Sequence, residues 1–132
     1  MSAGDHVQPK QLAMFMHPEE LKGMADLGET EDPQDWRDAN GAYYAAPQAI
    51  DNMWARKLKE AKSARGGMLG HGAGVHASVA REGVKNPVSV RDDSLVDGYH
   101  RVAAAHDLGH QFVPVLHGEF DVKAYPSYRS DV

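Results

Sequence analysis

The 132-residue chain contains no cysteine. This absence excludes a disulfide framework, a thiolate metal site and cysteine-based catalysis. No apolar run approaches the roughly 20 residues that a membrane-spanning helix needs. The opening residues, MSAGDHVQPK, also lack the charged-then-apolar layout of a secretory signal. We therefore expect one soluble domain without a membrane role, in the cytoplasm or in a phage particle assembled there.

Charge is unevenly distributed along the chain. The formal net charge of -5 argues against a surface that binds nucleic acid all round. Residues 26–38, DLGETEDPQDWRD, hold six acids and one arginine, whereas residues 56–65, RKLKEAKSAR, hold five bases and one acid. The simplest interpretation is a solvated loop and a solvated helix face. The alternative is a basic strip that binds phosphates, DNA or an acidic partner.

The first half of the chain has a mainly helical pattern. LAMFM at 12–16 is typical of a short buried strand, and Pro18 with the acids after it starts a helix. We expect an exposed acidic loop around Pro33 and the longest helix from Pro47 to about Ala64. Its apolar stripe, at spacings of four and three, comprises Ile50, Trp54, Leu58 and Ala61.

Residues 66–74, GGMLGHGAG, are rich in glycine. They lack the Gly-Lys-Ser/Thr of a P-loop, and no strand precedes them as a dinucleotide-binding turn requires. We predict a flexible linker. The alternative is a mobile lid over a site.

From residue 75 onward the pattern alternates between helix and strand. A helix at 75–83 turns Val75 and Val79 inward, and a second helix, 99–108, buries Val102, Ala105 and Leu108 before Gly109 stops it. We expect one strand at 88–90, a turn at 92–94 and, directly after it, a second strand of two or three residues. A third strand follows at 112–116, and an edge strand lies within the C-terminal EFDVKAYPSYRSDV. This order predicts an α/β fold, a small mixed sheet flanked by helices with a helical N-terminal half.

Residues 82–116 resemble the ParB N-terminal domain and its sulfiredoxin-fold relatives. The matching blocks are EGVKNPVSV, LVDGYHRVAAAHDLG and FVPVLHG, in the family's order and spacing. The Asp-Gly-x-His-Arg form is similar to the branch that contains free-serine kinases and proteins labelled ParB-like nucleases. The resemblance implies a single domain over 1–132, matched best at 75–122, with 26–74 as a helical insertion or a variant half.

In these relatives the Gly-x-(His/Arg)-Arg turn binds the phosphates of CTP, ATP or ADP. The resemblance therefore implies a phosphate site made of Gly98, His100 and Arg101, with weaker candidates Gly83, Asn86 and Pro87. The chemistry of the residues agrees, because a helix N-terminus offers N–H donors to an anion. An arginine there adds a planar bidentate donor.

Several neighbouring residues have two interpretations. Asp97 is most simply an N-cap that accepts the N–H of His100, and its functional alternative is to hold Mg²⁺ against nucleotide phosphates. Glu19 and Glu20 suit a helix start, and they stand where the kinase-like relatives keep a general base. Tyr99 replaces the sulfiredoxin cysteine, which excludes peroxiredoxin repair.

We expect a ParB-like, nucleotide- or phosphate-binding accessory protein of a phage or mobile element. Weak NTPase or phosphotransferase activity stays open, since no residue compels a catalytic conclusion. One alternative is a non-enzymatic interaction or virion-assembly protein, including a homo-oligomer, that reuses the fold. Another is a DNA-associated accessory protein or ParB-like nuclease that uses the basic helix 56–65. The sixteen residues after Leu116 are too few for the helix-turn-helix of ParB.

Overall fold

A four-stranded mixed sheet organises the computed structural model, which describes residues 12–117. The strand order is β1-β4-β2-β3. Strand β4 pairs antiparallel with β1 and parallel with β2, while β2 and β3 form an antiparallel hairpin. The predicted α/β class is thus confirmed. The strands are β1 (Leu12–Met16), β2 (Val88–Arg91), β3 (Ser94–Asp97) and β4 (Val113–His117).

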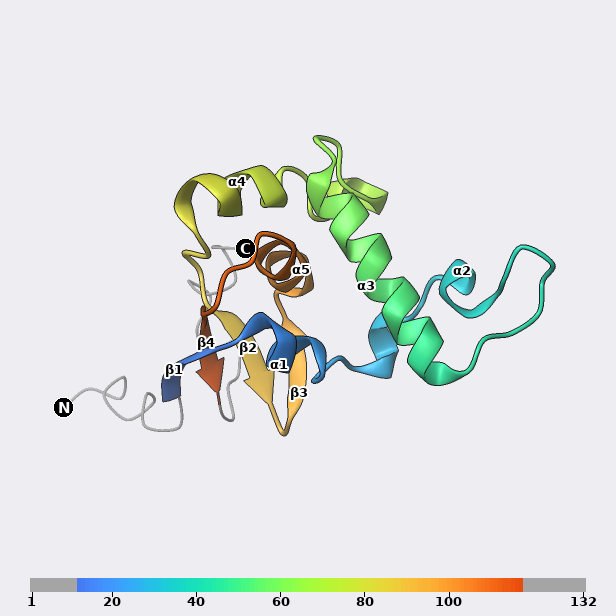
Figure 1. The fold of residues 1–132 in the computed structure, drawn as a ribbon, viewed down its shortest axis with the longest axis horizontal. Coiled ribbons are helices and arrows are strands. Elements are labelled where there is room, and N and C mark those ends of the chain that lie inside the picture. The colour runs from blue at the N-terminus through green and yellow to red at the C-terminus, as the bar shows by residue number, and fades with distance from the viewer. Residues whose placement is uncertain (1–11, 118–132) are drawn as a thin grey trace.

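Helix α5 is the centre of the helical layer. It packs against α1, α3 and α4. Figure 1 shows α5 between α4 and the strands, with α3 to one side. The helices are α1 (Pro18–Lys22), α2 (Pro33–Trp36), α3 (Ala46–Lys62), α4 (Val75–Glu82) and α5 (Tyr99–Asp107), with 3-10 turns η3 (Leu27–Glu29) and η4 (Met68–Gly70). No helix within residues 12–117 is long and apolar enough to cross a membrane.

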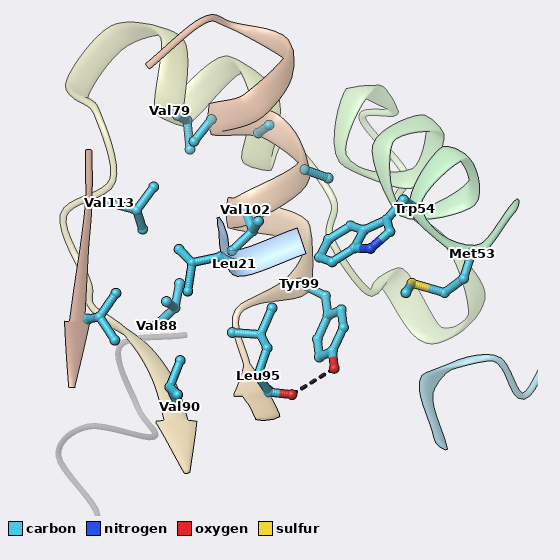
Figure 2. Close-up of a cluster of buried hydrophobic side chains, with 14 residues drawn as sticks. Leu21, Met53, Trp54, Val79, Val88, Val90, Leu95, Tyr99, Val102 and Val113 are labelled. Carbon is cyan, nitrogen blue, oxygen red and sulfur yellow. Dashed lines mark hydrogen bonds between the residues drawn. The ribbon is translucent and has the colours of Figure 1, made fainter. Parts of the chain in front are cut away.

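The core forms where the inner face of the sheet meets α5. Alternate residues of β2, Val88 and Val90, are buried, as are Val113 and Val115 of β4. Figure 2 shows the strand valines on the same side as Val102 of α5. Each fully buried side chain of this size contributes about 1.5–3 kcal/mol, so this face fixes how α5 sits on the sheet.

Helix α3 follows the predicted stripe. Pro47 lies in its first turn, and Trp54 and Ala61 are buried, while Ile50 and Leu58 are partly buried against the core. The helix ends at Lys62, two residues before the predicted end. Trp54 stacks on Tyr99 of α5 with ring centroids 5.2 Å apart, and this contact joins the two helices.

The acidic segment is largely exposed, as we predicted, but it is not a loop. It forms η3 and α2, the latter with Asp32 as N-cap and Pro33 in its first turn. Asp35 is only 2% exposed and bonds to Arg56 of α3. A buried carboxylate requires such a charged partner, because losing its hydration costs several kcal/mol. The prediction missed the burial of Asp35 because sequence pattern does not reveal this long-range pairing.

The hairpin between β2 and β3 turns on two residues with left-handed backbone. Asp92 and Asp93 have φ of 50° and 64°, which is typical of a two-residue type I′ turn. Strand β4 begins at Val113 rather than at the predicted Phe112, which is exposed. The predicted C-terminal edge strand lies outside the described residues.

Candidate functional site

A cleft with a volume of about 570 Å³ opens over the start of α5. Its volume falls within the range of about 300–1,000 Å³ typical of small-molecule sites. Its lining includes the run 96–101 and the glycine-rich segment at 70–73. Lys57 of α3, Glu29 of η3 and Val75 of α4 complete it. The cleft therefore lies at the turn that the sequence singled out.

The predicted site residues divide into two groups. Four of them line the cleft, namely Asp97, Gly98, His100 and Arg101. Asn86 and Pro87 lie behind Arg101, whose Nη1 donates to their carbonyl oxygens at 2.7 and 3.1 Å. Gly83 ends α4 with a left-handed φ of 74° and is not part of the lining.

Gly98, not Asp97, occupies the N-cap position of α5. Its φ is 105°, and a Cβ there would overlap the side chain of Val88, so only glycine lets β2 approach the helix start this closely. The carboxylate of Asp97 lies 3.4 Å from Nη2 of Arg101 instead. The predicted Asp97 cap was therefore wrong. No side chain of the described residues caps this helix, and its positive dipole end suits an anion.

Arg101 is a fixed cation in the floor of the cleft. Only 12% of its side chain is exposed, and its guanidinium bonds to the carbonyls of Asn86 and Pro87 and to Asp97. These contacts tether the segment before β2 to the first turn of α5. Arg101 can therefore supply positive charge to a ligand without moving, but it also has a structural role.

His100 is paired with Glu60 of α3. Its Nε2 lies 2.7 Å from Oε1 of Glu60, and both side chains are less than a fifth exposed. Burial lowers the pKa of His100 below 6.5, and the bond to Glu60 opposes this only in part. The imidazole is consequently neutral near pH 7, with its Nε2 proton donated to Glu60.

The glycine-rich segment 66–74 is folded against this pair. The Gly67 N–H donates to the carbonyl of His71 at 2.8 Å, and the Gly74 N–H donates to that of Ser63 at 3.0 Å. A Cβ on Gly72 would overlap the ring of His100, and a Cβ on Gly67 would overlap the carboxylate of Glu60. Glycine is required at these two positions because the backbone touches both partners.

Lys57 is the lining residue that sequence analysis missed. Its Nζ lies 3.0 Å from Oε1 of Glu29 and 5.6 Å from the centre of the Tyr99 ring. In the sequence it was one of five bases, with nothing to distinguish it from Lys59. Only the position of α3 beside α5 shows that Lys57 faces the cleft while Lys59 is exposed.

The basic run 56–65 is largely neutralised within the chain. Arg56 pairs with Asp35, Lys57 with Glu29, and Lys62 with Asp107 at 3.5 Å. The acidic partner considered from the sequence is thus, in part, the chain's own segment 26–38. Less uncompensated charge remains for DNA than the run alone suggests.

Neither glutamate of α1 lines the cleft. Glu19 pairs with His106 on the far end of α5, and this contact holds α1 against α5. Glu20 is exposed in the first turn of the same helix. Their position suits the helix dipole and gives no support to a role as general base.

Asp97 offers Mg²⁺ a single carboxylate. No group of three or more potential ligands (His, Cys, Asp or Glu) is arranged to hold a metal ion within residues 12–117. Mg²⁺ is commonly bound by one or two carboxylates together with substrate phosphates. The residues therefore fit an ion that arrives with a nucleotide, and not a resident metal.

No protein-family model matches this chain, and no curated protein or solved structure matches it. The likeness to ParB-like proteins stays a prediction from three sequence blocks. A functional assignment must therefore come from the geometry of the cleft.

Proposed function

We propose that the protein binds the phosphates of a nucleotide, CTP, ATP or ADP with Mg²⁺, in the cleft over α5. The observation that carries this proposal is the uncapped start of α5 inside a cleft lined by the cations Lys57 and Arg101. The ring of His100 gives its proton to Glu60, so it adds no charged donor to this set. Backbone N–H groups at a helix start bind phosphate, and charged donors shorten and strengthen such bonds.

The charges of the cleft allow an incoming phosphate to replace a carboxylate as the partner of a lining cation. Lys57 and Arg101 face Glu29 and Asp97, so the formal charges of these four lining residues cancel. The Glu29–Lys57 pair is partly exposed, and pairs of this kind contribute only about 0.2–1 kcal/mol. A phosphate can therefore take the Nζ of Lys57 at little cost. Asp97 would hold Mg²⁺ that arrives with the nucleotide, and the charge of that ion would offset the remaining repulsion.

The biological setting is part of the same proposal. We place the protein in the cytoplasm, as an accessory protein of a phage or mobile element, on the strength of the resemblance at residues 82–116. The structure bears on this setting only through the lack of a membrane-spanning helix within residues 12–117.

A second candidate function is assembly with copies of the chain or with virion proteins. Met68 and Leu69, side by side in η4, are 83% and 91% exposed, and Leu69 has a left-handed φ of 56°. Adjacent apolar side chains held in water by such a backbone favour contact with another protein. The replacement of both by serine should then lower the mass measured by light scattering.

Calorimetric titration with CTP, ATP and ADP in the presence of Mg²⁺ tests nucleotide binding. Lys57→Ala should weaken binding by about tenfold to 100-fold, since losing a charge-assisted hydrogen bond costs about 1.5–3 kcal/mol. Lys59→Ala is the matched control, because Lys59 is two residues away and exposed. The proposal fails if the wild-type chain binds none of the three nucleotides.

A further inference from the structure

A second cavity, with a volume of about 430 Å³, lies beside the cleft over α5. It shares Glu29, Lys57 and His71 with that cleft, and we call it the side groove. The rest of its lining comes from the link between η3 and α2, from α3 and from η4. The exposed side chains of Met68 and Leu69 form its apolar part.

This apolar part belongs to an ordered turn. The Gly70 N–H donates to the carbonyl of Gly67 at 3.0 Å, and the His71 N–H donates to that of Met68 at 3.2 Å. Leu69 has a left-handed backbone, which leucine rarely adopts and which glycine adopts without strain. The turn therefore presents both apolar side chains in a fixed backbone conformation, so a partner would bind them with little loss of backbone entropy.

The charged part of the side groove is acidic. Four carboxylates and two cations give its lining a net formal charge of -2, with histidine counted as neutral. These charged residues are Glu29, Glu31, Asp32, Arg56, Lys57 and Glu60. Arg56 is already paired with Asp35, which lies outside the groove, and Lys57 is paired with Glu29. Glu31 is exposed and forms no ion pair within residues 12–117, so uncompensated negative charge lies beside the apolar pair.

This combination selects the kind of partner. Nucleic acids and anionic lipid surfaces are repelled by the net negative charge of the groove. A second copy of the chain is also disfavoured, because a two-fold contact would bring the same acids of two copies together and each copy has a net charge of -5. A protein segment with apolar and basic side chains complements both parts of the groove.

We propose that the side groove binds a basic amphipathic segment of a partner protein. Apolar side chains of that segment pack on Met68 and Leu69, and its arginine or lysine side chains pair with Glu31 and Asp32. The inference rests on the second candidate function, assembly through Met68 and Leu69, and it names the chemistry of the partner. It does not depend on nucleotide binding in the cleft.

Selection of a displayed library of random short peptides on the full chain tests this inference. The selected peptides should be enriched in lysine and arginine together with leucine, methionine and phenylalanine. Fluorescence anisotropy of a labelled selected peptide then measures the Kd. Replacing Met68 and Leu69 by serine should raise the Kd about tenfold or more, since the peptide loses two apolar contacts. Phe112→Ser, an exposed apolar residue outside the groove, is the matched control and should leave the Kd unchanged.

The charged part of the groove is tested separately. Glu31→Lys should raise the Kd about threefold to tenfold, because a repulsive contact replaces an exposed ion pair. Glu20→Lys makes the same charge change on α1, outside the groove, and should have little effect. Added salt should weaken the wild-type complex and have less effect on the Glu31→Lys complex.

The outcomes separate this inference from the second candidate function. The inference is overturned if the selected peptides are acidic or uncharged, or if the serine variant binds them as tightly as the wild type. Light scattering covers the other occupant. A dimeric wild type that the serine replacements convert to a monomer would assign the groove to a second copy, which overturns the basic segment and leaves assembly standing. A monomeric wild type that selects no peptide overturns both.

Discussion

Asp35 binds Arg56 with both carboxylate oxygens. Oδ1 lies 3.2 Å from Nε and Oδ2 lies 2.9 Å from Nη2, although the two residues are 21 positions apart. Arg56 also donates to the carbonyl of Glu29 at 3.2 Å. The contact holds the acidic segment 26–38 against α3. The acidic and basic stretches of the sequence therefore pair with each other within the fold.

Asp35→Asn should lower the free energy of unfolding by about 2–3 kcal/mol, toward the low end for a broken buried pair because Arg56 is partly exposed. The loss arises because Arg56 keeps its charge without a matching carboxylate. Urea unfolding measures it. Glu31→Gln, an exposed acid of the same segment, is the control and should change stability by less than about 0.5 kcal/mol. Equal losses in the two variants would show that the segment responds to net charge alone.

Gly98→Ala should destabilise the protein by about 3 kcal/mol or more, since a strained backbone adds to overpacking in the core. Gly98 has φ of 105°, and its new methyl group would meet Val88. Gly74→Ala is a matched control. Gly74 is also a left-handed N-cap, with φ of 69°, but a Cβ there meets nothing, so only the backbone cost of about 1–2 kcal/mol applies. Thermal unfolding of both variants gives the difference, which should vanish if Val88 can move aside freely.

Tyr99→Phe should cost about 1–3 kcal/mol, the penalty for leaving buried polar groups unpaired. The hydroxyl donates to the carbonyl of Leu95 at 2.6 Å, as Figure 2 shows, and accepts the N–H of Asp26 at 2.9 Å. Burial also raises the pKa of Tyr99 to about 12. Ultraviolet titration of the wild type should therefore show one late-ionising tyrosine that the variant lacks. If all the phenols ionise together near pH 10, the hydroxyl is not buried as described.

Stability should decrease as the pH falls below about 6.5, the ordinary pKa of histidine. Burial lowers the pKa of His100 in the folded state, so the unfolded chain binds the extra proton first and the equilibrium moves toward it. The contribution of His100 to stability is fully present above its pKa in the unfolded chain. It is lost as the pH falls through the lower pKa that His100 has in the folded protein. The lowered pKa values of Glu19 and Asp107 act in the same direction at more acid pH. Urea titrations from pH 8 to pH 5 should give a flatter profile for His100→Gln, and an unchanged slope would count against the burial of this ring.

The spacing of apolar residues predicted the positions of those helices and strands that bury one face against the core. The stripe of α3 and the alternating valines of β2 and β4 are set by local spacing, so their positions are correct to within one or two residues. The start of α5 was likewise found from Gly98 and the residues after it. Each of these features depends on neighbours only a few positions away.

The partners of the charged residues could not be found in this way. His100 meets Glu60 from 40 positions away. Which of the five bases of residues 56–65 faces the cleft depends on how α3 lies across α5. Asp97 was misjudged for a related reason, since the packing of Val88 against Gly98 decides which residue caps α5. Side-chain chemistry indicated the kind of contact, but tertiary packing selected the partner.

Strand β4 joins the two parts of the sheet, because it lies between β1 and the β2–β3 hairpin and pairs with β1 and with β2. Of the four strands, β1 is synthesised first and β4 last. Leu12, the first residue of β1, pairs with His117, which is roughly 100 positions later in the chain. Until β4 is synthesised, the hairpin and β1 have no backbone link, and the inner valines of β2 lack their neighbours Val113 and Val115. Folding of the nascent chain should thus be all-or-none and late, after β4 has left the exit tunnel.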